Sequence, residues 1–541
     1  MKIYIIEKKD NNKRIADFFR EQELDFLPVA YSINKELVPH HTKVKTNDVV
    51  ESYSMTHKLG YRVYVKSLIF LLHYTINELL PKGLFEVSHT ISKGIYCSFK
   101  NGLAITESQV LMIKSRMKEL IKQNIVLEVN DIPREEAIEI LKKLHGKNEK
   151  WQFGDKFPEV LPIYTLGNYS DYFYGPLVES TSLLESFDLH YFMPGFVIRF
   201  ARRNNSEKLF AFKELPKFFD VLEESNKFTD ILDITAINSI NEKIINGQGK
   251  RLILTGEALQ EKKISRIAEH ITSNALKYQL IMISGPSSSG KTTFSKKLET
   301  ALYANGQKPI VLSLDDFYVN RSKTPIGKDG KPDYESIYSI DLDLFQNVLA
   351  ALISGEEVEI PKFNFAQGER YYNGTFIKKD RKSPIIIEGI HGLNPKLTSK
   401  VPRHLKYFVY VTSLTQVNLD RVNHVKTTDA RLIRRIIRDN RDRSFDIERT
   451  LSLWPNVRKG EETNIFKYQE YADIMFNSNL PYELNVLKPF AEPLLAAVTK
   501  DSKYYMDARH LLNVLRYFEP LETTWIPSSS LLREFIGHKY D

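Results

Sequence analysis

A glycine-rich run in the second half of the chain constrains its fold more than any other feature. Gly285-Pro-Ser-Ser-Ser-Gly-Lys291-Thr292 follows the apolar segment 279–284 and precedes a helical pattern. Small residues let backbone N–H groups turn around phosphate oxygens, and the start of a helix adds partial positive charge. We expect Lys291 to reach the β- and γ-phosphates of a nucleoside triphosphate and the Thr292 hydroxyl to lie on Mg²⁺. The predicted triphosphate-binding residues are Gly285, Ser287, Ser288, Ser289, Gly290, Lys291, Thr292 and Thr293.

Four apolar runs around this loop predict the strands of a parallel sheet. They span residues 279–284, 308–313, 384–388 and 407–411, and helical patterns separate them. Continuous apolar runs are typical of strands buried on both faces, and their alternation with helices indicates a doubly wound α/β domain. We place this domain at about 245–490. Residues 491–541 are expected to form a helical extension that packs against it, because so short a segment is marginal alone.

Acidic residues follow two of these predicted strands. Asp315 and Asp316 come directly after the second strand, and Glu388 ends the third. Ligands of a doubly wound sheet bind at the carboxyl ends of its strands. A carboxylate at that edge can accept the proton of an attacking hydroxyl, and a second one suits Mg²⁺ or its water shell. We therefore predict Asp315 as a general base and Glu388, with Thr292, as a Mg²⁺ residue.

Positive charge is concentrated in one predicted helix. Six arginines lie between positions 431 and 443, and the first four have the spacing of a single helical face. A solvated helix or an RNA-binding face is the ordinary interpretation of such a run. After a phosphate loop, an arginine-rich lid that neutralises the triphosphate is the favoured alternative. The six residues are Arg431, Arg434, Arg435, Arg438, Arg441 and Arg443.

Taken in order, these motifs resemble the uridine kinase/phosphoribulokinase family over about residues 280–480. The likeness includes Leu314-Asp-Asp-Phe-Tyr318, Ile387-Glu-Gly-Ile and the arginine run that follows Asp429. By this resemblance Lys291 and Asp315 are catalytic, Arg438 and Arg443 bind phosphate from the lid, and ATP is the phosphoryl donor. The acceptor-binding residues that it implies are Tyr318, Glu335 and Arg434.

Two positions depart from the uridine kinase pattern. Gly368 stands where those kinases carry a base-contacting histidine, and Leu453 stands where they carry a glutamine beside the acceptor. Losing groups that hydrogen-bond a substrate can abolish specificity for it. The phosphotransfer residues are therefore kept, whereas recognition of uracil is in doubt.

The first half of the chain resembles part of another family. The likeness is carried by Lys66-Ser-Leu-Ile-Phe70, Glu78-Leu-Leu-Pro81, Tyr174-Gly-Pro-Leu-Val178 and Ser186-Phe-Asp-Leu189. By it, residues 61–235 resemble the editing-type second domain of threonyl-tRNA synthetase, and residues 1–60 resemble a TGS domain. On this alignment the metal ligands of that family become Lys66, Phe70, Phe173 and Leu177. A cationic lysine is a poor zinc ligand and the other three have no donor atom, so we predict neither zinc nor editing activity there. A binding, regulatory or dimerising role follows.

Length and composition restrict the remaining possibilities. The chain has 541 residues, which implies about three or four domains. Its single cysteine, Cys97, cannot form an internal disulfide, and no apolar stretch reaches the roughly 20 residues that span a bilayer. The start of the chain shows no signal peptide. We therefore expect a soluble, cytoplasmic protein without a membrane partner.

The combined prediction is an ATP-dependent, Mg²⁺-requiring kinase with a small-molecule acceptor, most simply the 5′-hydroxyl of a nucleoside. One alternative keeps the same machinery and takes a sugar or sugar phosphate as acceptor. A less favoured alternative is a nucleotide-regulated RNA-binding protein, suggested by the synthetase-like first half. The sequence leaves open the acceptor, the role of residues 1–235, and whether the chain forms a homo-oligomer.

Overall fold

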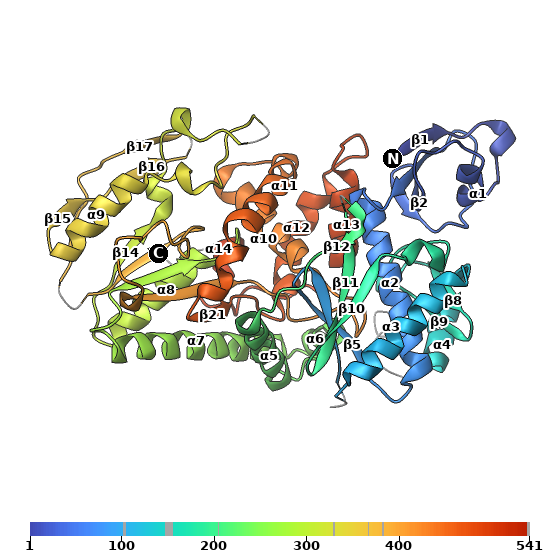
Figure 1. Cartoon of the computed structure of the whole chain (residues 1–541), viewed down its shortest axis with the longest axis horizontal. Coiled ribbons are helices and arrows are strands. Elements are labelled where there is room, and N and C mark those ends of the chain that lie inside the picture. Colours follow the sequence, from blue (N-terminus) through green and yellow to red (C-terminus); the bar gives the residue numbers. More distant parts are fainter. Residues whose placement is uncertain are drawn as a thin grey trace.

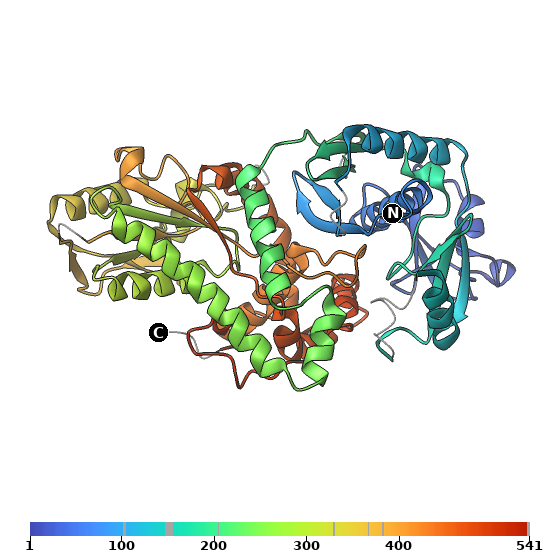
Figure 2. The ribbon, with the colours of Figure 1, turned by 90° about the horizontal axis from the view of Figure 1, so that it is seen from below.

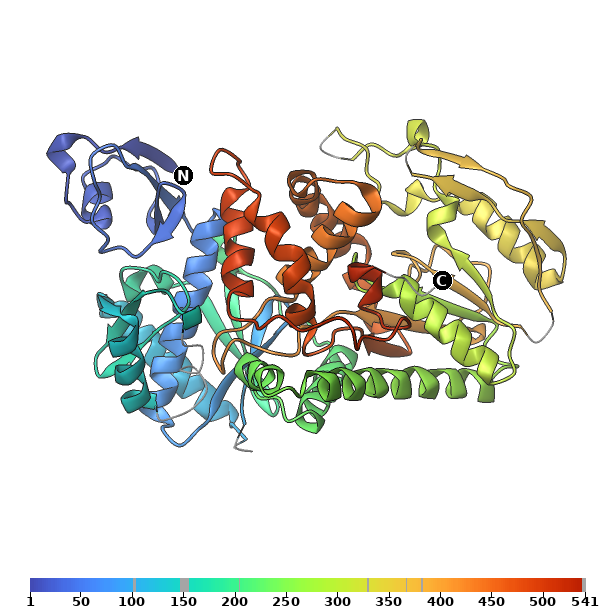
Figure 3. The same cartoon turned by 180° about the vertical axis from the view of Figure 1, so that it is seen from behind.

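The computed structural model describes residues 1–100, 104–145, 155–203, 205–327, 330–365, 367–380 and 383–537. Figure 1 shows an elongated molecule with antiparallel sheets of the N-terminal half at one end and a parallel sheet at the other. Helices from the C-terminal third lie between these ends, as the reverse view in Figure 3 also shows. Within the described ranges, no helix is both long enough and apolar enough to cross a lipid bilayer.

The N-terminal end is a four-stranded antiparallel sheet packed on one short helix. The strand order is β1-β4-β2-β3. Phe18 and Phe19 of the helix are both buried against the sheet, where Phe18 packs on Tyr4 and Phe19 on Tyr31. The elements are β1 (Lys2–Ile5), α1 (Ile15–Arg20), β2 (Pro28–Ile33), β3 (Glu36–Val38) and β4 (Val49–Ser54), all inside the predicted TGS-like region.

The next region combines two long helices with two antiparallel sheets. One sheet has the order β10-β11-β6-β5 with β12 paired to β11, and the other has the order β7-β8-β9. Strands β11 and β12 pair antiparallel. The elements are α2 (Lys58–Leu79), β5 (Phe85–Ile91), β6 (Gly94–Phe99), α3 (Glu107–Lys122), β7 (Glu128–Pro133), α4 (Arg134–His145), β8 (Val160–Leu166), β9 (Tyr169–Asp171), β10 (Phe187–Phe192), β11 (Gly195–Arg202) and β12 (Asn205–Leu209).

The four positions aligned with synthetase metal ligands lie in the core of this region. Phe70 and Phe173 are fully buried, and their rings pack edge to face with centroids 5.2 Å apart. Leu177 is buried beside them in the same apolar cluster. Lys66 Nζ donates a hydrogen bond to the backbone oxygen of Tyr174 at 2.7 Å. Apolar packing thus occupies three of these positions, and a lysine bonded to backbone occupies the fourth.

Three helices connect this region to the parallel sheet. They are α5 (Pro216–Ile231), α6 (Ile237–Ile245) and α7 (Gly249–Ser273). Figure 2 shows α7 as the long green helix that leads from the middle of the molecule to the sheet. Gly256 lies within α7. In the folded chain the Tyr482 ring lies 2.7 Å from where a Cβ on Gly256 would be, so glycine permits close helix packing there.

The second half contains the predicted parallel sheet. Its order is β14-β19-β13-β20-β21, and every neighbouring pair is parallel. Every residue of β13, β19 and β20 is buried, as their continuous apolar runs predict. The doubly wound α/β fold class is therefore confirmed. The strands are β13 (Leu280–Ser284), β14 (Ile310–Ser313), β19 (Ile385–Glu388), β20 (Lys406–Thr412) and β21 (Ile474–Asn477), and the intervening helices include α8 (Lys291–Ala304) and α9 (Leu342–Ser354).

Further elements surround the carboxyl edge of this sheet. Two small hairpins, β15 with β18 and β16 with β17, follow α9. Helix α12 crosses residue 491, where we placed the start of the extension, and joins one apolar cluster with α13. The elements are β15 (Glu357–Glu359), β16 (Lys362–Asn364), β17 (Glu369–Tyr371), β18 (Phe376–Lys378), α10 (Thr427–Arg443), α11 (Ile447–Asn464), α12 (Glu483–Ala496), α13 (Tyr505–Leu515) and α14 (Arg533–Ile536).

Candidate active site

The phosphate loop connects β13 to α8 and requires its two glycines. A Cβ on Gly285 would lie 2.0 Å from the backbone oxygen of Val411 in the neighbouring strand. Gly290 has a φ of +82°, in the left-handed region that disfavours side chains. Ser288 and Ser289 are buried, and their hydroxyls have no hydrogen-bond partner within the described ranges. The loop therefore has the backbone shape of a phosphate-binding loop, with hydroxyls available at its centre.

Residues of α10 and α11 hold this loop at Ser287. Arg431 donates to the Ser287 backbone oxygen at 2.7 Å, and Arg435 donates to the Ser287 hydroxyl at 2.8 Å. The Ser287 N–H donates to the Glu461 carboxylate at 3.0 Å. Glu461 is fully buried and also pairs with Arg431 and Arg458. Although burial opposes it, the Arg431 charge holds the pKa of Glu461 below its ordinary value.

Arg434 lies elsewhere than the resemblance implied. We expected it to help hold the acceptor, but its side chain is 0% exposed and forms a two-pronged ion pair with buried Glu483. It also donates to the Ser288 backbone oxygen at 3.2 Å, and its guanidinium lies over the Phe535 ring. All of these partners belong to the protein, so this position supports the loop and does not favour contact with an acceptor.

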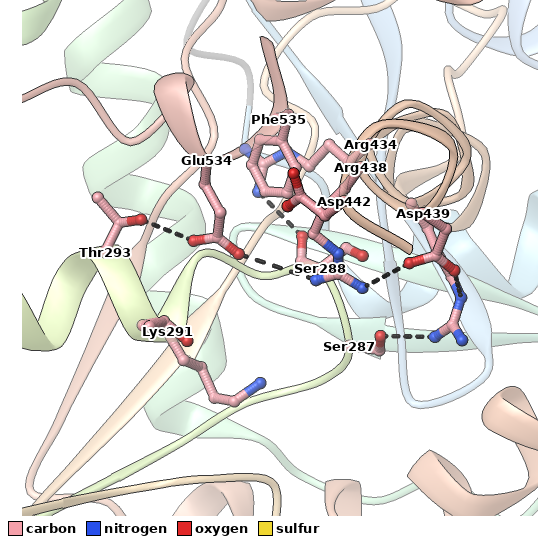
Figure 4. Close-up of polar contacts among 12 residues, drawn as sticks. Ser287, Ser288, Lys291, Thr293, Arg434, Arg438, Asp439, Asp442, Glu534 and Phe535 are labelled. Carbon is pink, nitrogen blue, oxygen red and sulfur yellow. Dashed lines mark hydrogen bonds and ion pairs between the residues drawn. The ribbon is translucent and has the colours of Figure 1, made fainter. Parts of the chain in front are cut away.

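Arg438 and Arg443 do remain together at the end of α10. Both pair with the buried carboxylate of Asp439, each at 3.3 Å, and Arg435 pairs with the same residue at 3.1 Å. Figure 4 shows the Asp439 carboxylate beside the arginine helix, with dashed lines to two guanidinium groups that lie on its loop-facing side. The Arg443 side chain is 46% exposed, so part of its guanidinium is free to meet a phosphate. Asp439 lies four residues from both Arg435 and Arg443, a spacing that already predicts such pairing.

The carboxylate of Glu534, near the end of the described residues, lies between the phosphate loop and α10. Thr293 Oγ1 donates to Glu534 at 2.8 Å, and Arg438 lies 3.8 Å from the other Glu534 oxygen. In Figure 4 the Glu534 side chain lies between these two partners. Arg441 donates to the backbone oxygens of Glu534 and Phe535. Short helix α14 is therefore docked on both the phosphate loop and the arginine helix, which no sequence pattern indicated.

Asp315 and Glu388 follow β14 and end β19, as predicted. Asp315 keeps solvent contact, yet surrounding protein atoms raise its pKa, and the charges of Lys291 and Arg443 oppose that rise. Glu388 is buried and accepts hydrogen bonds from Ser313 at 3.1 Å and Thr292 at 3.4 Å. Burial, with the Asp315 charge second, raises the pKa of Glu388 to about 7. The two carboxylates and Lys291 thus influence one another at the carboxyl edge of the sheet.

The raised pKa of Glu388 has a consequence for stability. Its folded-state pKa of about 7 exceeds the ordinary 4.5, so the folded protein favours the protonated form. Protonated Glu388 therefore makes its full contribution to the free energy of unfolding below its ordinary pKa of 4.5. That contribution is lost as pH rises through its folded-state pKa of about 7. Without nucleotide, we expect Glu388→Gln to match the wild type near pH 5 and to exceed it near pH 8 by on the order of 2–3 kcal/mol. Denaturant unfolding at both pH values measures this, with exposed Glu357→Gln as control, and an equal difference at both would contradict it.

On the acceptor side, Tyr318 and Glu335 lie near Asp315. The Tyr318 hydroxyl donates to the Tyr334 backbone oxygen at 3.3 Å, and burial followed by the Asp315 and Glu335 charges raises its pKa. Burial, with Glu461 second, raises the pKa of Glu335 to about 7. The Tyr318 ring lies 5.8 Å from Phe363 and 6.1 Å from Phe365, measured between centroids. Aromatic rings and one carboxyl group therefore meet beside the predicted base.

The position that departs from uridine kinases is occupied by an arginine side chain. A Cβ on Gly368 would lie 2.6 Å from Arg321 Nε, so any larger residue would displace this guanidinium. The Arg321 guanidinium donates to the Phe365 backbone oxygen at 2.7 Å, and the Arg321 backbone N–H donates to the Gly368 backbone oxygen at 2.8 Å. The second departing residue, Leu453, is 37% exposed on α11. Arg321 is thus a polar group at the acceptor side that the sequence comparison did not indicate.

Gly460 of α11 gives a direct test of the Glu335 position. A Cβ there would lie 2.4 Å from the Glu335 Cβ, so Gly460→Ala must displace the carboxyl group. Misplacing a substrate-positioning group by about 1 Å can cost up to roughly 10²-fold. We expect kcat/KM for the acceptor to fall by about 10- to 100-fold while KM for ATP stays within about twofold. Steady-state kinetics measure this beside Lys459→Ala, an exposed neighbour, and an unchanged acceptor kcat/KM would contradict it.

The oxygen groups at the loop suit Mg²⁺ that arrives with a nucleotide. No cluster of three or more His, Cys, Asp or Glu side chains within the described ranges could hold a metal ion alone. Mg²⁺ prefers oxygen ligands, keeps several waters and takes phosphate oxygens as ligands. The Thr292 hydroxyl and the Glu388 carboxylate, 3.4 Å apart, provide such donors beside the loop. These residues therefore fit a shared protein–nucleotide site.

The match to known families is consistent with this geometry. Residues 280–483 match the model of the Phosphoribulokinase / Uridine kinase family. The segment begins at β13 and includes the phosphate loop, both strand-end carboxylates and α10. Residues 280–483 form a phosphoribulokinase/uridine kinase family domain. This kinase domain implies the use of ATP and a small-molecule substrate, and the match leaves the identity of that substrate unresolved.

Individual proteins match smaller parts of the chain. A threonine–tRNA ligase of Francisella tularensis subsp. novicida is 29% identical over 162 residues, which are 30% of this chain and 25% of that protein. The chain thus spans about a quarter of the length of the curated relatives that it matches, and its N-terminal region distantly resembles threonyl-tRNA synthetase.

Two solved structures match with low TM-scores. A "putative fructose transport system kinase" of Silicibacter sp. TM1040 is 20% identical with a TM-score of 0.29, covering 39% of this chain and 98% of that one. A D-glycerate 3-kinase of Cryptococcus neoformans is 15% identical with a TM-score of 0.22, covering 50% and 88%. The family assignment therefore rests on the match of residues 280–483 alone.

Proposed function

We propose that the protein transfers the γ-phosphoryl group of ATP to a hydroxyl of a small acceptor, and that the acceptor is a nucleoside phosphorylated at its 5′-hydroxyl. The observation that carries this proposal is the position of Asp315. The Asp315 carboxylate follows β14 and makes no ion pair within the described ranges. The positive charges of Lys291, Arg443 and Arg438 favour its ionised form. A base without a protein partner at the phosphate end of the sheet is free to bind a substrate hydroxyl.

Each group has a definite part in the transfer. Asp315 orients the acceptor hydroxyl and accepts its proton, while the oxygen attacks the γ-phosphorus and the bond to the β-phosphate oxygen breaks. Lys291 and the exposed part of Arg443 neutralise charge on the phosphoryl group. Mg²⁺ would be held by Thr292, Glu388 and the nucleotide, and would supply further charge neutralisation there. Ser288 and Ser289 contribute hydroxyl groups at the centre of the loop.

The acceptor side supports a nucleoside through three features. Glu335 lies where a carboxyl group can accept hydrogen bonds from ribose hydroxyls, and its placement depends on Gly460. Tyr318, Phe363 and Phe365 form a cluster of aromatic rings on which a planar base can pack. Arg321 beside Gly368 supplies donors that suit carbonyl oxygens of a base.

The same arginine favours a second candidate acceptor. A guanidinium binds a phosphate group with charge-assisted, two-pronged hydrogen bonds, so Arg321 also suits a sugar phosphate. ATP consumption by the full chain against matched panels of nucleosides, sugars and sugar phosphates separates the two candidates. Acceptor-dependent ADP formation with a nucleoside supports the first proposal. Turnover only with sugar phosphates that is lost in Arg321→Met would replace it, and no acceptor-dependent ADP would refute both.

A further inference from the structure

A group of cations lies where the synthetase-like region meets the kinase domain. We call it the junction cluster and define it by the cations Arg62, Lys66 and Lys426, whose charges act on one another, together with the Asp429–His510 pair. Arg62 and Lys66 are one turn apart on α2, Lys426 precedes α10, and His510 lies on α13. His510 Nε2 and Asp429 Oδ2 are 2.7 Å apart. Three structural elements from two parts of the chain therefore bring their charged groups to one place.

The surrounding contacts hold these elements together. The Val87 N–H of β5 donates to the Arg421 backbone oxygen at 2.7 Å, and Asn418 donates to the Val87 oxygen at 2.7 Å. Tyr53 donates to the sulfur of Met506 at 3.6 Å. Lys58 pairs with Asp507, at the start of α2 and α13 respectively. The junction cluster is thus part of a packed interface between two folded regions. Its charged groups are therefore partly removed from solvent.

Positive charge in the junction cluster exceeds the negative charge that the protein provides. Within the described ranges, Arg62, Lys66 and Lys426 have no carboxylate within ion-pair distance, and Arg62 and Lys426 make no side-chain hydrogen bond. All three are half-buried. The carboxylates whose charges act on Arg62 are Asp429, which is bonded to His510, and Asp507, which is paired with Lys58. Buried or half-buried charges normally have partners, so two unpartnered cations beside a third indicate a missing anion.

The electrostatic effects on the same groups agree with this geometry. Burial, followed by the charges of Arg62 and Lys426, lowers the pKa of Lys66 to about 7. Burial and then Arg62 lower the pKa of Lys426 as well. Burial alone would raise the pKa of Asp429, but the charges of His510, Lys426 and Arg62 hold it well below its usual range. The three cations therefore repel one another, and an anion among them would relieve that repulsion.

We infer that the junction cluster is a binding site for a phosphate-class anion, either free phosphate or the phosphate group of a small metabolite. A guanidinium fork and two ammonium groups match a compact, multiply charged oxyanion. The backbone N–H groups at the start of α10 add a favourable partial charge beside Lys426. The site lies outside the phosphate loop, because Arg62 and Lys66 belong to the synthetase-like region and Lys426 precedes α10, whereas the loop is held by residues further along that helix.

Calorimetric titration with inorganic phosphate tests this inference in the full chain. A Lys291→Met background weakens binding at the phosphate loop, and chloride replaces other anions in the buffer. We expect one saturable site whose affinity falls about tenfold or more in Arg62→Gln and again in Lys426→Gln, and falls less in Arg62→Lys, which keeps the charge but not the guanidinium fork. The matched control is Lys118→Gln, an exposed lysine of the same region, which should leave phosphate affinity unchanged.

Several outcomes would overturn the inference. They are the absence of phosphate binding in the Lys291→Met protein, an affinity in Arg62→Gln and Lys426→Gln that equals that of the Lys291→Met parent, and a loss in Lys118→Gln as large as in these two variants. If Arg62→Gln melts at a higher temperature but binds phosphate as before, repulsion is relieved without any site. Circular dichroism measures whether each variant is folded. Because Arg62 and Lys426 lie in different regions, one variant still tests the inference if the other misfolds. A panel of phosphorylated metabolites then separates free phosphate from a phosphate group of a larger ligand.

Discussion

Replacing Asp315 with asparagine is expected to lower kcat by about 10²- to 10⁴-fold, the usual contribution of a positioned general base. The asparagine keeps the size of the side chain but cannot accept the proton of the acceptor hydroxyl. ATP affinity should change little, because the loop residues that hold the triphosphate stay in place. Steady-state kinetics with the best acceptor and equilibrium binding of ATP measure the two quantities separately.

The neighbouring carboxylate provides a matched control for this variant. Asp316 turns away to pair with Lys362 at 2.8 Å, so it is not available as a base. Asp316→Asn should therefore keep kcat within about threefold, since the pair that it breaks is partly exposed. If Asp316→Asn and Asp315→Asn lose turnover equally, or if Asp315→Asn keeps it, Asp315 is not the base.

The second large effect concerns stability and Arg434. Arg434→Met leaves the fully buried Glu483 without its ionic partner and removes the donor to the Ser288 backbone oxygen. Breaking one side of a buried ion pair typically costs about 3–5 kcal/mol, so we expect the free energy of unfolding to fall by about that amount. Denaturant titration, with intrinsic fluorescence as the signal, measures the change.

Arg443 is the matched comparison for Arg434. Its side chain is 46% exposed and pairs with Asp439 from the rim, so Arg443→Met should cost less than about 1 kcal/mol of stability. Its loss should appear in kcat, by about 10-fold or more, because a lid arginine neutralises transferred charge. Equal destabilisation by the two variants would contradict the different roles that we assign to these residues.

Local patterns in the sequence predicted the elements of the kinase domain well. The apolar runs became β13, β19 and β20, because strands buried on both faces need apolar residues at every position. Boundaries were less accurate where the cause lies outside the pattern. Helix α2 begins at Lys58, where the His57 ring accepts a hydrogen bond from the Leu59 N–H at 3.3 Å. Histidine is not a typical cap residue, so this start carried no signal.

The sequence predicted only those residues of the candidate site that belong to local motifs. Lys291, Asp315 and Glu388 follow strand ends, and their positions at the sheet edge could be inferred from topology alone. Glu461 and Glu534 bind the phosphate loop from 174 and 241 residues away in the chain. No periodicity encodes such pairings, because they depend on how α11 and α14 pack onto α10. For the same reason the motif predicted Arg434 as an acceptor-binding residue, whereas its side chain forms an ion pair with Glu483.

The most direct test of the central claim is ³¹P NMR of the full chain with Mg²⁺, ATP and a nucleoside. We expect the ATP signals to fall as ADP and a nucleoside 5′-monophosphate appear in equal amounts, and Asp315→Asn to form the monophosphate about 10²-fold or more slowly. Conversion of ATP to ADP and inorganic phosphate without a phosphorylated acceptor, or equal product formation by Asp315→Asn, would contradict it.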